Sequence, residues 1–171
     1  AKENLSMEVD GQPIKTALAR GQFNRVPVVI GTNHDEYRLF VAVIQLLGGR
    51  VTAANYQTKI ASTLGVSAAI AGAIAAQYPL SRYPSPPVAL GAVGTDAIFA
   101  CHALTAEQSL ARYVPTYAYE FNDENAPEPF LLHGRRELLP YLFNPASATH
   151  PVPFSQAQQK LAAAMKQDWT N

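Results

Sequence analysis

The sequence predicts a protein of the α/β class, in which helices flank a few parallel strands. A first strand is predicted over residues 25–33, where the β-branched run at residues 28–30 is stopped by Gly31 and Asn33. Its apolar residues point to both faces, which predicts burial on both faces, as in a parallel sheet. A second strand is predicted over residues 115–121, where aromatic residues alternate with smaller ones. Helical segments lie between the strands, as the α/β class requires.

Three helices are predicted directly after the first strand. The second of them carries Tyr56, Ile60 and Leu64 at every fourth position, which gives the helix one apolar face. Ser67 is predicted to be the N-cap of the third helix, and Pro79 to stop it. The predicted ranges are 36–47, 52–64 and 67–78.

A proline-rich segment and a longer helix are predicted next. The four prolines between residues 79 and 87 predict an ordered surface loop. Thr95 and Asp96 are predicted to cap a helix that ends near residue 112, which makes Asp96 a helix cap. The side chains predicted to face inward from this helix are Ile98, Cys101, Ala103 and Leu110.

The last helix is amphipathic and is predicted over residues 156–169, with Leu161, Met165 and Trp169 on its apolar face. Only two or three strands are therefore visible in 171 residues. A parallel sheet of that size leaves its edges open and its faces poorly covered. We expect residues 1–171 to form part of a sheet whose remaining strands lie outside this chain.

The composition excludes some classes of partner. With 13 basic and 13 acidic residues, the chain lacks the positive charge that a nucleic-acid binder needs. The longest apolar run expected to be helical, residues 66–76, is shorter than the roughly 20 residues that span a bilayer, so no membrane span is predicted. Cys101 is the single cysteine, which excludes an internal disulfide and a cysteine-based zinc site and predicts a buried thiol. A small molecule is the expected partner.

Ionisable residues follow both predicted strands. The phrase Asn33-His34-Asp35-Glu36 comes directly after the first strand, and His133 lies twelve residues beyond Phe121. Open α/β sheets build their ligand sites at the carboxyl ends of their strands. An acid after one strand and a histidine after the next is the order of the acid and base in α/β-hydrolases.

A longer stretch of the sequence points to one family among the α/β-hydrolases. Residues 21–36, which read GQFNRVPVVIGTNHDE, strongly resemble the segment that carries the catalytic acid in type-B carboxylesterases, the family that includes cholinesterases and bacterial esterases. The resemblance covers nearly the whole chain. Further phrases that follow in the family's order are Val9-Asp10-Gly11, Tyr78-Pro79, Thr95-Asp96, Tyr117 to Phe121 and Glu137-Leu138.

The resemblance implies an α/β-hydrolase fold and the hydrolysis of carboxylic esters through a serine acyl-enzyme, with a small-molecule ester as substrate and no cofactor or metal. It assigns Glu36 as the triad acid and His133 as the general base. In such a triad the carboxylate accepts the Nδ1 proton of the imidazole, and Nε2 takes the proton of the serine.

The chain departs from the family pattern in three respects. Tyr37 stands where the family usually has glycine after the acid, and the interval after His133 is about two residues longer than the family's. The sequence also contains no Gly-x-Ser-x-Gly nucleophile phrase and no glycine-rich oxyanion loop. We therefore expect the C-terminal portion of one carboxylesterase domain, inactive by itself because the serine is absent.

Two alternatives remain at this stage, and several residues have plainer interpretations. The chain could be a non-catalytic, cholinesterase-like binding protein, or a stand-alone domain with a binding or structural role. An upstream strand–Gly-x-Ser-x-Gly–helix segment would favour the esterase. The residues with plainer interpretations are His34 and His150 as surface or loop residues, His102 as a packing residue, and Tyr117 and Tyr119 as sheet packing. The sequence leaves the cellular compartment open.

Overall fold

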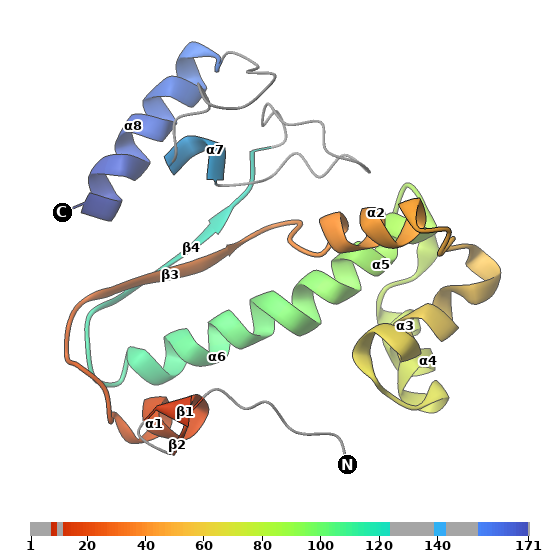
Figure 1. The fold of residues 1–171 in the computed structure, drawn as a ribbon, viewed down its shortest axis with the longest axis horizontal. Coiled ribbons are helices and arrows are strands. Elements are labelled where there is room, and N and C mark those ends of the chain that lie inside the picture. The colour runs from red at the N-terminus through yellow and green to blue at the C-terminus, as the bar shows by residue number, and fades with distance from the viewer. Residues whose placement is uncertain (1–7, 10–11, 124–138, 143–153, 171) are drawn as a thin grey trace.

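The computed structural model describes residues 8–9, 12–123, 139–142 and 154–170 (Figure 1). A long central helix lies beside a pair of strands, with smaller helices at either end. The regular elements are β1 (Glu8–Val9), β2 (Gln12–Pro13), α1 (Ile14–Arg20), β3 (Val28–Asn33), α2 (Arg38–Leu46), α3 (Tyr56–Leu64), α4 (Ala68–Gln77), α5 (Pro86–Gly94), α6 (Cys101–Leu110), β4 (Thr116–Phe121), α7 (Leu139–Leu142) and α8 (Gln156–Thr170).

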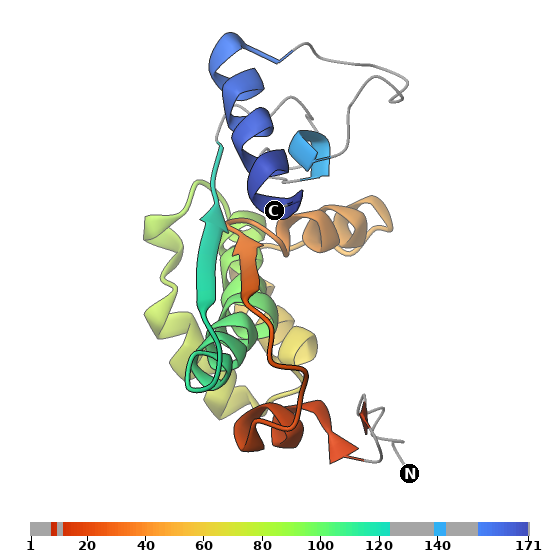
Figure 2. The same cartoon turned by 90° about the vertical axis from the view of Figure 1, so that its left-hand side faces the viewer.

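Strands β3 and β4 form a parallel pair, as the sequence predicts (Figure 2). Val28 is opposite Thr116 and Asn33 is opposite Phe121, so the two strands end at the same level. The ladder continues past Asn33, because the His34 N–H donates to the Phe121 carbonyl over 2.9 Å. Whatever follows the two strands therefore starts at one end of the sheet.

The central helix is longer than the sequence predicts. It begins at Pro86 and runs without interruption through α5, a π-helical segment at Thr95–Ala100, and α6. The prediction of a surface loop up to residue 87 was therefore wrong, because proline fits the first turn of a helix, where its missing N–H needs no partner. The predicted cap at Thr95 and Asp96 was also wrong, since both residues lie inside the helix.

This helix changes the expectation about membrane-spanning length. Residues Pro86–Leu110 form a 25-residue helix that contains an 18-residue window with a mean hydropathy of 1.4, so by length and composition it could cross a membrane. Unbroken apolar runs alone do not identify this helix in the sequence, and the absence of a membrane span stays a prediction. One such helix is weak evidence for a span, because the core helix of a folded domain has the same properties. Here the helix packs against α2, α3, β3 and β4.

Helices α2 to α5 enclose the larger hydrophobic core. Tyr56 and Ile60 of α3 are buried and Leu64 packs against the same core, which confirms the predicted apolar face. The Ser67 hydroxyl accepts from the Ile70 N–H at the start of α4, which confirms the predicted N-cap. The buried members of this core are Val41, Val51, Tyr56, Ile60, Ala71, Ala89, Leu90 and Val93.

The π-helical segment and α6 differ from their predicted burial. Leu110 is buried as predicted, but the Cys101 thiol is exposed and Ile98 is 37% exposed. The described neighbours of α6 are α1, the π segment, β3 and β4, and they leave much of the helix surface open. The prediction of a buried thiol was wrong, because the preference of cysteine for interiors says nothing about which side of this helix is covered.

The sheet is also less buried than predicted. Val29 of β3 is 47% exposed and Tyr117 of β4 is 63% exposed, so the prediction of a strand buried on both faces does not hold for the described residues. A smaller core closes the far end of β4. It consists of Phe121, Tyr141, Ala162 and Met165. On α8 the predicted Met165 is buried, whereas Leu161 and Trp169 stay about 40% exposed.

Candidate active site

The candidate acid, Glu36, lies in a turn just beyond the carboxyl end of β3. We call residues 33–37 the acid turn. The Asn33 backbone N–H donates to Glu36 Oε1 over 3.0 Å, so the side chain folds back toward the strand that precedes it. A second turn bond runs from the Arg38 N–H to the Asp35 carbonyl over 3.1 Å. The carboxylate of Glu36 is thereby held at the end of the sheet toward which β4 also runs.

Tyr119 of β4 is the aromatic neighbour of this carboxylate. Burial raises the pKa of the Tyr119 hydroxyl, and the negative charge of Glu36 raises it further. The two strands approach closely at this point because Gly31 is opposite Tyr119. A Cβ at Gly31 would lie 2.0 Å from the Tyr119 carbonyl oxygen, so any larger residue would push the strands apart. Gly31 is therefore needed for the packing beside the acid.

Asp35 has a different role from Glu36. Its side chain is 5% exposed, and its Oδ1 lies 2.9 Å from Arg38 Nε and 3.2 Å from His34 Nδ1. The ion pair with Arg38 joins the turn to the first residue of α2. His34 is exposed, as predicted. Asp35 thus stabilises the turn, whereas the Glu36 carboxylate accepts its hydrogen bond from the backbone.

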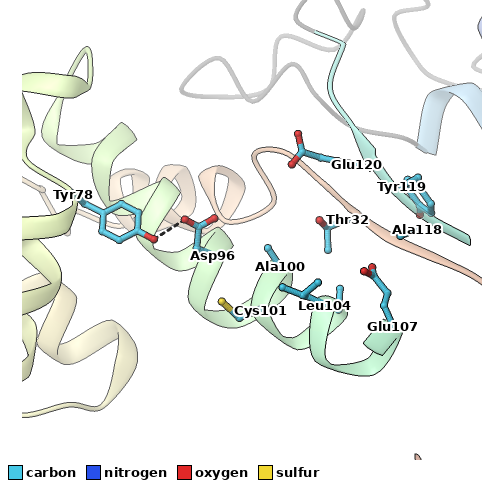
Figure 3. A pocket seen from close by; sticks show the side chains of 11 residues that line it. Thr32, Tyr78, Asp96, Ala100, Cys101, Leu104, Glu107, Ala118, Tyr119 and Glu120 are labelled. Carbon is cyan, nitrogen blue, oxygen red and sulfur yellow. Dashed lines mark hydrogen bonds between the residues drawn. The ribbon is translucent and has the colours of Figure 1, made fainter. Parts of the chain in front are cut away.

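The central helix provides two polar contacts that the sequence analysis did not anticipate. Thr95 Oγ1 accepts from the Tyr37 N–H over 3.0 Å, at the end of the acid turn. Asp96 accepts from the Tyr78 hydroxyl over 2.6 Å (Figure 3), and burial together with this bond raises the pKa of Tyr78. Both contacts join residues far apart in the sequence, so no local pattern could reveal them.

A hollow of about 470 Å³ lies between α6 and the sheet (Figure 3). The residues that line it include Asp96, Glu107, Glu120 and Cys101. A second hollow, of about 330 Å³, touches the acid turn through Asn33, His34 and Asp35, and it also touches Arg38 of α2. Among the described residues, no group of three or more His, Cys, Asp or Glu side chains is arranged to hold a metal ion.

The histidines are placed as follows. His133, the predicted base, and His150 lie outside the described residues. His102 is exposed on α6, with Nδ1 3.0 Å from the Ile98 carbonyl of the same helix. Of the two predicted triad residues, the structure therefore describes Glu36, together with the end of the strand that leads toward His133.

Comparison with known proteins identifies the class of this protein. A parallel strand pair with helices between and around it, and an acid held at the carboxyl end of the first strand, are features of an α/β hydrolase. Residues 5–171 match the model of the carboxylesterase family, and the chain belongs to that family. Membership implies the α/β-hydrolase fold and supports the hydrolysis of carboxylic esters in general. No curated protein and no solved structure matches this chain.

Proposed function

We propose that this chain supplies the acid and the base of a Ser-Glu-His triad to a carboxylesterase, with Glu36 as the acid and His133 as the base. The observation that carries the proposal is the position of Glu36. Its carboxylate accepts the Asn33 N–H at the end of β3, beside the end of the parallel strand β4 that precedes His133 in the chain. Acid and base would then meet at one end of one sheet.

The proposed chemistry gives each side chain one task. Glu36 accepts the Nδ1–H of the His133 imidazole, which fixes the tautomer that leaves Nε2 free to act as a base. Nε2 takes the serine proton as the serine oxygen attacks the ester carbonyl carbon, and the imidazolium then protonates the departing alcohol. Water hydrolyses the acyl-enzyme by the same route, which releases the carboxylic acid and restores the serine.

We further propose that residues 1–171 are the C-terminal portion of one α/β-hydrolase domain. The 171 residues contain no Gly-x-Ser-x-Gly phrase, so the nucleophile would come from polypeptide outside them. The exposure of Val29 and Tyr117 supports this proposal, because the strands of a parallel sheet are normally covered on both faces. The partners would be this remaining part of the domain and a small-molecule ester.

The test requires the chain expressed both alone and together with the segment encoded upstream of it. Alone, it should hydrolyse a short-chain aryl ester no faster than buffer and should not react with a serine-directed phosphonate. In the larger protein, Glu36→Gln should lower kcat by roughly four orders of magnitude, the effect expected when the acid no longer sets the imidazole tautomer. Glu107→Gln, a change of another half-buried acid, is the matched control and should leave kcat within about twofold.

Three results would contradict the proposal. If the larger protein keeps its activity after Glu36→Gln, Glu36 is not the triad acid. If it keeps its activity after His133→Ala, His133 is not the general base. Phosphonate-sensitive turnover by residues 1–171 alone would mean that the chain carries its own nucleophile.

A further inference from the structure

We infer that Gly94 and Thr95 of the central helix form a seat for the acid turn, and that Thr95 is a positioning residue for Glu36. The inference goes beyond the triad assignment but rests on it, because a positioned carboxylate matters for catalysis only if Glu36 is the acid. The seat itself is defined by contacts among residues 33–37, 94 and 95.

The acid turn is tied to the fold on both sides of Glu36. Before Glu36, the His34 N–H donates to the Phe121 carbonyl of β4 over 2.9 Å. After it, the Tyr37 N–H donates to Thr95 Oγ1 over 3.0 Å, across 58 residues of sequence. Thr95 is only 3% exposed, so water cannot readily replace the lost acceptor if its hydroxyl is removed. Glu36 therefore lies between a residue that is hydrogen-bonded to the sheet and a residue that is hydrogen-bonded to the central helix.

Gly94 provides the room that the side chain of Tyr37 needs. A Cβ on Gly94 would lie 2.2 Å from Tyr37 Cδ1, a distance at which the ring would have to move. On its way past Gly94, the Tyr37 ring stacks on Phe40 with ring centroids 5.2 Å apart. The family resemblance predicts glycine at position 37. In this chain Tyr37 occupies that position, and the glycine that makes room for its side chain is Gly94 of the helix packed against it.

The same side of α5 also meets the residue after Tyr37. A Cβ on Gly91, one turn before Thr95, would lie 2.9 Å from Arg38 Cγ. Gly94 and Thr95 lie three and four positions after Gly91, a spacing that places each of them next to Gly91 on the helix surface. The π-helical segment begins at Thr95 itself, and π segments occur frequently at functional sites. The turn that carries Glu36 is therefore in contact with the helix at the point where the helix geometry changes.

These contacts predict what Thr95 does. The Asn33 N–H reaches Glu36 Oε1 only while the turn keeps its shape, because donor and acceptor lie three residues apart. If the Tyr37 N–H loses its acceptor, the turn can open at that end and the carboxylate becomes less well oriented. The effect should appear at Asn33 and Tyr37 while the core around Ile60 stays intact.

The first experiment compares Thr95→Val with Thr105→Val in the 171-residue chain. Thr105 lies on the same helix but its hydroxyl donates only to the Cys101 carbonyl one turn earlier, so it is a matched control. NMR would follow the exchange rate of the Tyr37 amide and the Asn33 response, which is the change in the Asn33 amide shift that Glu36→Gln causes by removing the acceptor carboxylate. Thr95→Val should raise Tyr37 exchange by about tenfold and reduce the Asn33 response. Thr105→Val should change neither, and Thr95→Ser should restore both.

A second pair of variants covers the case in which Thr95→Val does not fold. Gly94→Ala should displace the Tyr37 ring and raise the exchange rate of the Tyr37 amide. In the Tyr37→Gly background, which lacks the ring, the added Gly94→Ala change should alter the exchange rate of the residue 37 amide by no more than about threefold. The two changes should be non-additive because the side chains are in contact. If the effects of the two changes on the exchange rate of the residue 37 amide were additive, or if Gly94→Ala left that rate unchanged, the proposal that Gly94 forms a seat for the acid turn would be wrong.

The failure of this inference can be told apart from the failure of the triad assignment. Unchanged Tyr37 exchange and an unchanged Asn33 response in folded Thr95→Val would overturn the seat, whatever Glu36→Gln does to catalysis. In the larger, active protein, Thr95→Val should lower kcat by about tenfold with KM unchanged, and Thr95→Ser should recover it. Loss of kcat without recovery by serine would overturn the positioning role. Full activity of Glu36→Gln would overturn the triad assignment and with it the catalytic role of Thr95, whereas the contacts of Gly94 and Thr95 with the acid turn would still be judged by the NMR experiments.

Discussion

The helical part of the molecule and its sheet differ in how completely they bury their apolar residues. Ile60 and Leu90, in the core enclosed by α2 to α5, are 0% exposed, whereas Val29 and Tyr117 on the sheet are 47% and 63% exposed. Helices satisfy their own backbone hydrogen bonds and can close a core with a few neighbours. A parallel strand needs a further strand at each edge and cover on each face. Among the described residues, the helical core is therefore closed, whereas the two-stranded sheet leaves apolar side chains exposed.

Helix α2 marks the boundary between the two regions. Its Val41 and Ala42 are buried against the core, at 0% and 1% exposure. The same helix and the residue that follows it also leave four large apolar residues exposed, namely Phe40, Val43, Leu46 and Leu47. The element that directly follows the acid turn thus belongs to the closed core on one side only.

The largest effect should come from a cavity in the helical core. Ile60→Ala removes a fully buried side chain and should lower the free energy of unfolding by about 3 kcal/mol. Ile70→Ala on the neighbouring helix, where the side chain is 52% exposed, is the matched control and should cost less than about 1 kcal/mol. Urea unfolding of both variants measures the difference. Equal effects would show that the helices do not form a closed core.

A smaller effect should come from the buried hydroxyl of Tyr56 in the same core. Tyr56→Phe removes the bond from this hydroxyl to the Tyr78 carbonyl, 3.0 Å away, and should cost about 1 kcal/mol at pH 7. Burial, helped by the neighbouring Tyr83, raises the pKa of Tyr56 from 10.0 to about 12.

The same variant should respond differently to alkaline pH. Between pH 10 and 12 the unfolded chain loses the Tyr56 proton while the folded chain keeps it, so the stability that this hydroxyl contributes falls as pH rises. The difference in the free energy of unfolding between the wild type and Tyr56→Phe should therefore be constant below pH 10 and should become smaller above it. Urea unfolding at pH 8 and pH 11 measures this, and a gap that widens at pH 11 would contradict the burial of Tyr56.

The smallest effect is expected on the open sheet. Val29→Thr keeps a β-branched side chain on a half-exposed position and should change the stability of the 171-residue chain by less than about 0.5 kcal/mol. If the remaining part of the domain covers this face, the same substitution in the larger protein should cost about 1 kcal/mol or more. Equal and negligible effects in both proteins would mean that the exposed face of the sheet stays open. The difference in burial between the helical core and the sheet would then persist in the larger protein.

The sequence by itself determined the elements whose signal is local. The spacing of Tyr56, Ile60 and Leu64 located an apolar helix face, the turn chemistry of Ser67 located a cap, and the alternation at residues 115–121 located β4. The parallel pairing of β3 and β4 was also predictable, because the acid and base of the resembled family must meet at one end of a sheet. Such patterns involve neighbours in the chain or a shared phrase, and both are visible without coordinates.

Only the tertiary structure decided which sides of these elements are covered and which distant residues touch. Prolines that suggested a loop begin the central helix, and Thr95, expected to cap it, lies within it and accepts the Tyr37 N–H. Cys101 is exposed because it lines the open hollow between α6 and the sheet, which no described element fills. The physical reason is the same in each case. A buried hydrogen bond or an exposed face depends on what packs nearby in space, and 58 residues of chain separate Tyr37 from the hydroxyl that binds it.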